Sequence, residues 1–131
     1  MSFVFSTPIR FAHCDPAGIA YFPRLLELVD AAVEDWTAAK IGVSRANMHG
    51  PLRRGMPTVD LRADFTAPCR LGETLDIAIT HDELGTSSVA LTATVTVAGA
   101  ARFTAQLKQV LMDLDAVRAV AWPAEWRARL E

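Results

Sequence analysis

The chain has 131 residues, of which 51% are hydrophobic and 21% are charged, and its formal net charge at pH 7 is −2. This length fits one domain over residues 1–131, and the composition excludes an intrinsically disordered chain. The slightly acidic balance provides no bulk basic field for nucleic acid or anionic lipid, and no stretch approaches the roughly 18 apolar residues of a membrane-spanning helix. Two cysteines do not make a disulfide framework. We therefore expect a cytoplasmic protein that binds neither nucleic acid nor membranes.

The first elements predicted along the chain are a strand and a long helix. Residues 3–11 form a β-prone segment that lacks the basic start of a signal peptide. Pro23 suits a first helical turn, and Gly42 suits a helix end. Between them, apolar residues recur at helical spacing and predict an amphipathic helix over about residues 22–40. Its apolar face consists of Leu25, Leu28, Val29, Ala32, Val33 and Trp36.

The rest of the chain predicts mainly β-structure. Residues 41–55 have no clear period and predict a loop with one short helical turn around residues 44–48. Alternation of apolar residues then predicts four strands, and two short breaks between them favour hairpins of an antiparallel sheet. A short helix is expected to begin near Pro123. This α+β order lets the sheet bury one face of the helix, and it leaves sheet surface for a partner subunit. The four strands are expected around residues 59–65, 75–79, 89–97 and 103–107.

Residues 13–23 read H-C-D-P-A-G-I-A-Y-F-P and hold the clearest chemical signal. Asp15 lies in a Pro/Gly turn just ahead of the predicted helix. An isolated Asp-Pro is more often a turn former or helix cap than a catalytic group. Here, however, the free N–H groups of the first helical turn can hold an oxygen that gains negative charge. A carboxylate beside such donors suits acyl transfer.

The order of this turn, a long helix, Gly-Met-Pro at residues 55–57 and four further strands resembles the hotdog-fold acyl-CoA thioesterases. The resemblance is strongest to the bacterial 4-hydroxybenzoyl-CoA thioesterase group. It implies a hotdog fold, in which a five-stranded antiparallel sheet wraps around one long helix. It also implies hydrolysis of a CoA thioester to free acid and CoA, without a cofactor, in a homodimer or homotetramer whose pocket lies at a subunit interface.

Carried over to this chain, the resemblance assigns site residues. It implies that Asp15 acts as nucleophile or general base, that the backbone N–H of Phe22 polarises the thioester oxygen, and that Gly18 allows a close approach of the substrate. Asp30 matches a position near the ring hydroxyl of an aromatic acyl group. Met56 stands where that group has a threonine, so one polar contact to a para-hydroxyl is missing.

The cations that would bind the CoA phosphates must differ from those of the 4-hydroxybenzoyl-CoA thioesterase group. The 4-hydroxybenzoyl-CoA group places basic residues in the hairpin after its third strand, whereas residues 84–87 here read Leu-Gly-Thr-Ser. On positional grounds, the candidates are Arg53, Arg54 and Arg70.

Two other functions stay open at this point. A hotdog hydratase or dehydratase needs an imidazole near a carboxylate and would recruit His13; a non-catalytic dimer would bind an acyl thioester without cleaving it. A nucleophilic Cys14 is disfavoured, since neighbours in sequence rarely converge on one atom. His13, His49 and His81 share no metal-ligand spacing with one another or with the cysteines, and no metal is expected.

Overall fold

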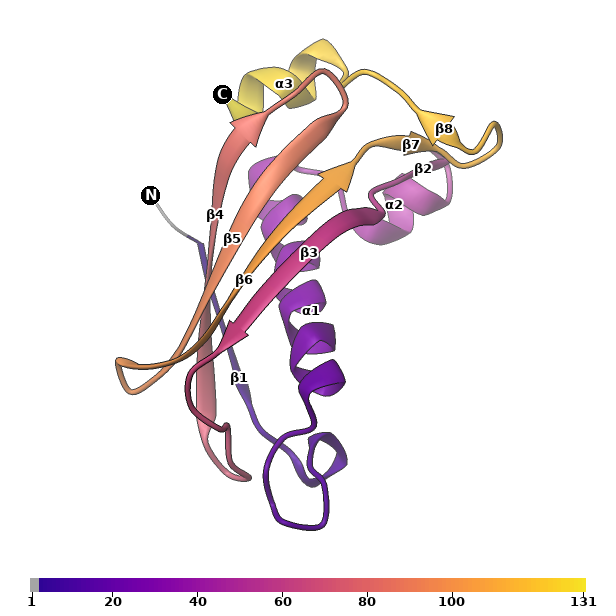
Figure 1. Cartoon of the computed structure of the whole chain (residues 1–131). Coiled ribbons are helices and arrows are strands. Elements are labelled where there is room, and N and C mark those ends of the chain that lie inside the picture. Colours follow the sequence, from indigo (N-terminus) through magenta and orange to yellow (C-terminus); the bar gives the residue numbers. More distant parts are fainter. Residues whose placement is uncertain (1–2) are drawn as a thin grey trace.

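A computed structural model describes residues 3–131 (Figure 1). Its main elements are one five-stranded sheet, one long helix and two shorter helices. In chain order they are β1 (Phe3–Pro8), the 3-10 turn η1 (Phe11–His13), α1 (Phe22–Lys40), α2 (Arg45–His49), β2 (Arg54–Gly55), β3 (Thr58–Phe65), β4 (Thr74–Leu84), β5 (Ser88–Val97), β6 (Ala100–Val110), β7 (Met112–Asp113), β8 (Arg118–Ala119) and α3 (Ala124–Leu130).

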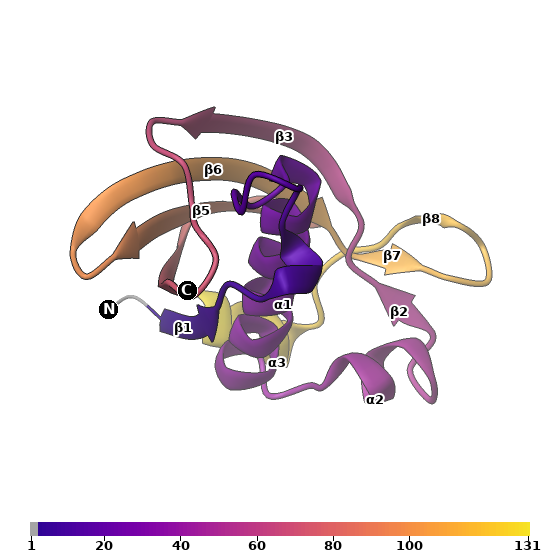
Figure 2. The same cartoon turned by 90° about the horizontal axis from the view of Figure 1, so that it is seen from below.

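The large sheet is antiparallel throughout, with the strand order β1-β4-β5-β6-β3. β4, β5 and β6 follow one another as hairpins, as the short breaks predicted, and β1 and β3 form the two edges. The sheet curls around α1, which lies along its concave face (Figure 2). The predicted α+β fold, with five antiparallel strands around one long helix, is confirmed.

α1 buries the face that its apolar spacing predicted. Leu25, Val29, Val33 and Trp36 are each 3% exposed or less, whereas Leu28 at the edge of that face is half-buried. The inward positions of the central strands are equally buried, because successive side chains of a strand point to opposite faces of the sheet. Helix and sheet therefore share one core.

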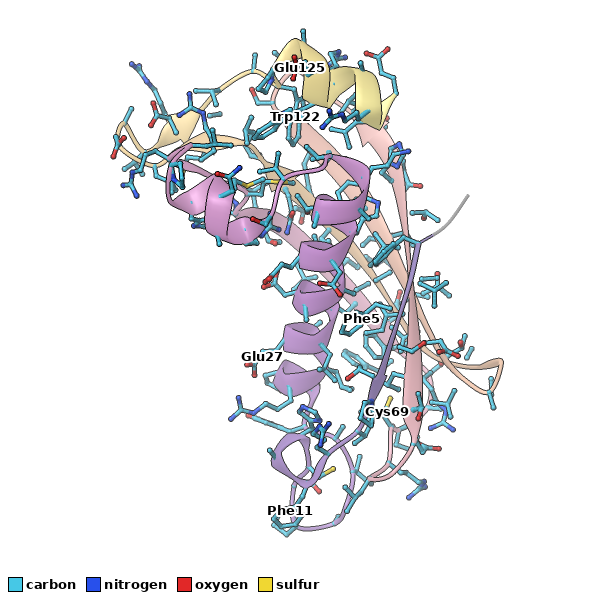
Figure 3. The ribbon with its side chains drawn as sticks, turned by 180° about the vertical axis from the view of Figure 1, so that it is seen from behind. Phe5, Phe11, Glu27, Cys69, Trp122 and Glu125 are labelled. Carbon is cyan, nitrogen blue, oxygen red and sulfur yellow. The ribbon has the colours of Figure 1, made fainter. Side chains whose placement is uncertain are left out.

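The short elements near the C-terminal end of α1 were predicted only in part. The short helical turn expected at residues 44–48 is α2, whose N-terminus is capped by the Ser44 hydroxyl accepting from the Asn47 N–H at 3.1 Å. The expected helix near Pro123 is α3, which packs Trp126 and Leu130 into the core. A second small sheet, β2-β7-β8, was not anticipated. Figure 3 shows α3 with Trp122 and Glu125 at one end of α1 and Phe11 at the other.

Two features of the fold concern contacts of the protein with membranes and with other chains. No helix among residues 3–131 is long and apolar enough to cross a membrane. The edge strand β3 has exposed apolar side chains, with Val59 59%, Leu61 45% and Phe65 45% exposed. Such an edge offers unpaired backbone groups to another strand.

Candidate active site

The Asp15 turn is closed by its own side chain. Oδ1 of Asp15 accepts the backbone N–H of Ala17 at 2.9 Å and that of Ile19 at 3.4 Å, while the Asp15 N–H donates to the Ile19 carbonyl at 2.9 Å. Such an Asx turn fixes the carboxylate relative to the backbone. Oδ2 accepts no hydrogen bond from residues 3–131, and the side chain is exposed. One carboxylate oxygen is thus held in place and the other is free to act.

Gly18 completes this turn with φ +76°, a left-handed conformation that disfavours any residue with a Cβ. A Cβ built at Gly18 would meet no atom within 4 Å, so the space beside it is open. The turn rests on the loop between β3 and β4, because the Leu71 N–H donates to the Gly18 carbonyl at 3.0 Å and the Ala20 N–H donates to the Cys69 carbonyl at 2.8 Å. The position of Gly18 is consistent with the two properties expected of it, a turn that favours glycine and open space through which a substrate could approach.

The first residue of α1 leaves a hydrogen-bond donor unused. The N–H groups of Arg24 and Leu25 both donate to the Tyr21 carbonyl, and Pro23 has no N–H. Among residues 3–131, no acceptor is found for the Phe22 N–H, and Tyr21 provides no side-chain cap. An unused N–H at the positive end of a 19-residue helix is suited to an anionic oxygen.

Two cavities follow the seam between α1 and β3. The first has a volume of about 340 Å³, and the second, deeper along α1, has about 210 Å³. A tilted aromatic pair lies at the first, where the Phe22 and Phe65 ring centroids are 6.2 Å apart. The seam is therefore a mainly apolar depression that begins beside Phe22. The first cavity is lined by Ala20, Phe22, Leu25, Phe65, Thr66, Ala67, Pro68 and Cys69; the second by Leu26, Val29, Asp30, Val33, Thr58, Leu61, Leu107 and Gln109.

The second cavity contains the polar group that the resemblance implied and one that was missed. Asp30 faces it from α1, about 12 Å along the helix axis from Phe22 at 1.5 Å per residue. Gln109 faces it from β6 and is only 1% exposed. Sequence analysis overlooked Gln109, although it stands at an inward position of the alternating strand. The signal in the sequence is a polar residue at an inward position of β6 whose preceding inward residues are apolar.

Met56 is buried but does not line either cavity within one chain. Its Sδ accepts from a guanidinium nitrogen of Arg45 at 3.6 Å, as does Sδ of Met48. Burial lowers the pKa of Arg45, and the negative charges of Asp30 and Glu34 oppose that shift. A substrate contact of Met56 stays a prediction. Arg45 is a charged neighbour of Asp30 that the sequence did not reveal.

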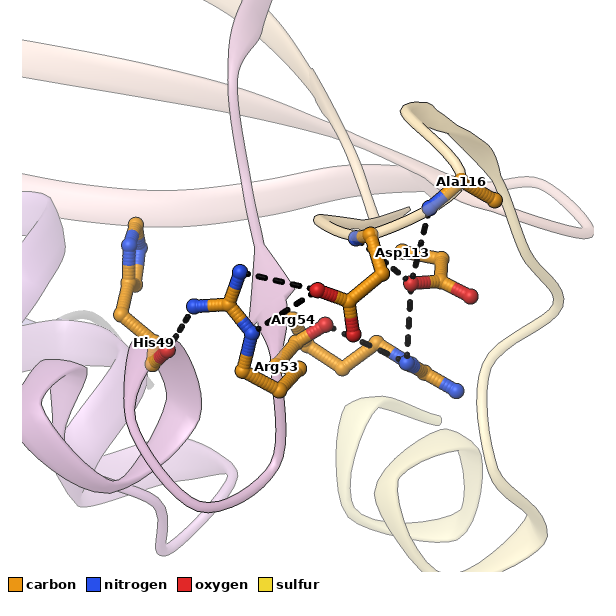
Figure 4. Close-up of polar contacts among 6 residues, drawn as sticks. His49, Arg53, Arg54, Asp113 and Ala116 are labelled. Carbon is orange, nitrogen blue, oxygen red and sulfur yellow. Dashed lines mark hydrogen bonds and ion pairs between the residues drawn. The ribbon is translucent and has the colours of Figure 1, made fainter.

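Arg53 and Arg54 lie beside the small β2-β7-β8 sheet, at the end of α1 away from the Asp15 turn. The guanidinium of Arg53 pairs with Asp115 at 2.9 Å and donates to the His49 carbonyl, and that of Arg54 lies 3.7 Å from Asp113 (Figure 4). Both cations already have carboxylate partners within the chain. Their contact with CoA phosphates stays a prediction.

His13 and Cys14 both form hydrogen bonds with the backbone of Arg10. Nδ1 of His13 accepts the Arg10 N–H at 2.9 Å, and Sγ of Cys14 donates to the Arg10 carbonyl at 3.4 Å. His13 lines a separate cavity of about 320 Å³ with Arg24 and Glu27. This geometry gives no support to a hydratase that uses His13. Within residues 3–131, no three His, Cys, Asp or Glu side chains are grouped to hold a metal ion.

Comparison with known proteins connects this geometry to a family. Residues 9–130 match the family model described as the Thioesterase-like superfamily. The chain belongs to this superfamily. The predicted hotdog fold and the predicted class of enzyme, a thioester hydrolase, are thereby confirmed.

Named relatives within the superfamily act on aromatic CoA thioesters. The chain is 27% identical, over 86% of its length and 76% of the other chain, to a 1,4-dihydroxy-2-naphthoyl-CoA hydrolase of Nostoc punctiforme. It shares its fold with a 1,4-dihydroxy-2-naphthoyl-CoA thioesterase from Synechocystis, with a TM-score of 0.88, 22% identity and coverage of 99% and 96% of the two chains. It also shares its fold with a gentisyl-coenzyme A thioesterase, with a TM-score of 0.86, 21% identity and coverage of 95% and 99% of the two chains.

Proposed function

We propose that the protein hydrolyses an aromatic acyl-CoA thioester, of the 4-hydroxybenzoyl-CoA type, to the free acid and CoA. The observation that carries this proposal is the pairing of two free groups at one end of α1. Oδ2 of Asp15 is a free carboxylate oxygen, and the Phe22 N–H is a free donor beside an apolar cavity. Thioester hydrolysis needs an oxygen that acts as nucleophile or base, a donor that stabilises the oxyanion, and a pocket for the acyl group.

Asp15 can act by either of two routes. As a nucleophile, its carboxylate oxygen attacks the thioester carbon, CoA leaves as a thiolate that takes up a proton, and water then hydrolyses the resulting anhydride. As a general base, Asp15 takes a proton from a water molecule that attacks the same carbon; the C–S bond then breaks, and the proton passes to the departing CoA thiolate. In both routes the thioester oxygen becomes negative, and the Phe22 N–H stabilises it. The positive electrostatic potential at the N-terminus of α1 stabilises the same negative oxygen further.

The aromatic substrate class is supported by the shape of the seam and by the relatives. Apolar side chains and two aromatic rings line the first cavity, and Asp30 provides a carboxylate in the second. The named relatives include enzymes for a dihydroxynaphthoyl and a gentisyl thioester, both with hydroxylated rings. We therefore favour a hydroxylated aryl group over an alkyl chain.

The proposal includes assembly of the chain into a homodimer or a homotetramer. Pairing two copies of β3 edge to edge and antiparallel would continue the sheet across a twofold axis. The start of β3 in one copy would then lie near the end of β3 in the other. Because Met56 precedes β3 and Phe65 ends it, this pairing brings Met56 and Arg54 of one copy toward the Phe22 end of its partner.

Thiol release from a panel of CoA esters tests the proposal. We would assay benzoyl, hydroxybenzoyl, dihydroxynaphthoyl, phenylacetyl and fatty acyl esters with the wild-type protein and with Asp15→Asn. The variant keeps the size of the side chain and is expected to lose about 10²- to 10⁴-fold in turnover, as for loss of a general base. Near-normal turnover by Asp15→Asn would refute the role of Asp15. Tight binding without turnover of any ester would favour the non-catalytic acyl-binding dimer instead.

A further inference from the structure

Gln109 is the one buried side chain among residues 3–131 that keeps a polar atom without a hydrogen-bond partner. Its Nε2 donates to the Thr58 hydroxyl at 3.2 Å, but its Oε1 has no partner. The residue is 1% exposed. A buried amide oxygen without a partner is unfavourable, and proteins seldom retain one unless it has a use.

The strand register directs this amide toward α1. On β6, Phe103, Ala105, Leu107 and Gln109 occupy alternate, buried positions, whereas the intervening residues are mostly exposed. Alternate residues share one face of a strand, so Gln109 points into the space between the sheet and the helix. There it lines the 210 Å³ cavity.

Gln109 borders an apolar cavity that contains one charged group. Leu26, Val29 and Val33 approach from α1, and the carboxylate of Asp30 lies on the same side. If the amide of Gln109 is turned over, its oxygen accepts from Thr58 and its NH₂ group is left without a partner instead. In both orientations one end of the amide is available. A hydroxyl group satisfies either end because it both donates and accepts.

We propose that Gln109 determines specificity by binding a hydroxyl substituent on the acyl group, which Asp30 contacts from the opposite wall. This inference rests on the proposed thioesterase function and adds a residue from β6 to it. An unsubstituted ring would fill the cavity but leave the amide unpaired, whereas a hydroxylated ring would pair it. The same amide therefore favours one ligand and disfavours the other.

The test compares benzoyl-CoA with its 2-, 3- and 4-hydroxy derivatives. The wild-type protein is expected to favour its best hydroxylated isomer over benzoyl-CoA by about 10- to 100-fold in kcat/KM, the range for leaving a buried polar group unpaired. Gln109→Met has nearly the same length and no hydrogen-bonding amide. We expect it to bring this ratio close to one, mainly by raising kcat/KM for benzoyl-CoA. Gln109→Leu serves as a second apolar variant in case the methionine variant does not fold.

Gln106→Met is the matched control. Gln106 lies on the same strand but is exposed on the outer face, so its substitution should leave the ratio unchanged. Equal ratios in the wild-type protein and both Gln109 variants would overturn the role of Gln109 while leaving the thioesterase intact. So would a wild-type protein that hydrolyses benzoyl-CoA as fast as every hydroxylated isomer. If no ester in the wider panel is hydrolysed, the proposed function fails, and this inference fails with it.

Discussion

Arg102 on β6 forms two hydrogen bonds with Glu73, the residue that directly precedes β4. Its two terminal guanidinium nitrogens lie 2.7 and 2.8 Å from Oε1 and Oε2 of Glu73, and the pair is largely screened from solvent. Arg102 also donates to the Pro68 carbonyl at 2.7 Å, and Glu73 accepts the Arg70 N–H. These contacts fix the loop between β3 and β4 on which the Asp15 turn rests. The ion pair therefore supports the position of the Asp15 carboxylate.

The first prediction concerns pH and Glu73. Hydrogen bonds from Arg102 and from the Arg70 backbone hold the pKa of Glu73 below its ordinary value. A lowered pKa in the folded state contributes stability above the unfolded-state pKa of about 4.3, and that stability is lost as pH falls through the folded-state value. Glu73→Gln should therefore lower Tm at pH 7, and its difference from wild type should shrink toward pH 3. Thermal unfolding across this range measures the difference; a gap that does not depend on pH would contradict the assignment.

The second prediction separates the backbone of Phe22 from its ring. Phe22→Pro removes the N–H at the first helical position, where proline is tolerated, and Tyr21 already has φ −75° and ψ 126°, which suit a residue before proline. Loss of one oxyanion donor costs about 10²- to 10³-fold in kcat. Phe22→Ala also removes the ring but keeps the N–H, so the drop in kcat should be specific to the proline variant. Equal kcat values for the two variants would show that the N–H does not contribute.

The sequence predicted the long elements because their periods extend over many residues. Pro23 and Gly42 bounded a helix that runs over Phe22–Lys40, and simple alternation located the strands of the main sheet. β2, β7 and β8 have two residues each, so they are too short to show a period. Their pairing depends on contacts between residues far apart in the chain, for which a single sequence has no local signal.

The same distinction applies to the candidate site. Asp15 and Phe22 belong to one contiguous turn and helix start, so their proposed roles could be inferred from local sequence. The ion pair of Arg53 with Asp115 could not be predicted in this way, because the two residues lie 62 positions apart in the chain. Gln109 was readable in principle, because it interrupts an inward apolar series, but its unpaired oxygen depends on what surrounds it in space.

The third prediction concerns the turn at Gly18. An alanine there would have to adopt φ near +76°, which costs about 1–2 kcal/mol, and its Cβ would meet no other atom within 4 Å. We expect Gly18→Ala to lose about this free energy of unfolding in urea and also to lose turnover, because relief of the strain would displace the Asp15 carboxylate. Gly99, in the hairpin between β5 and β6, has φ +82° and the same open surroundings. Gly99→Ala should cost similar stability but keep its activity; a parallel loss of activity in both variants would point to a general effect of stability.

The fourth prediction tests pairing at β3. Val59 is 59% exposed on this edge and lines neither seam cavity, whereas Val4 is 54% exposed on β1, the opposite edge. If two copies join through β3, Val59→Lys should weaken the dimer about 100-fold, because each copy loses one buried valine that contributes about 1.5 kcal/mol. Val4→Lys should leave it unchanged. Sedimentation velocity over a dilution series would give both dissociation constants, together with thiol release at each concentration. A dimer that weakens with Val4→Lys alone would place the interface at β1. Activity that does not fall as the Val59→Lys dimer dissociates would show that one chain contains the whole site.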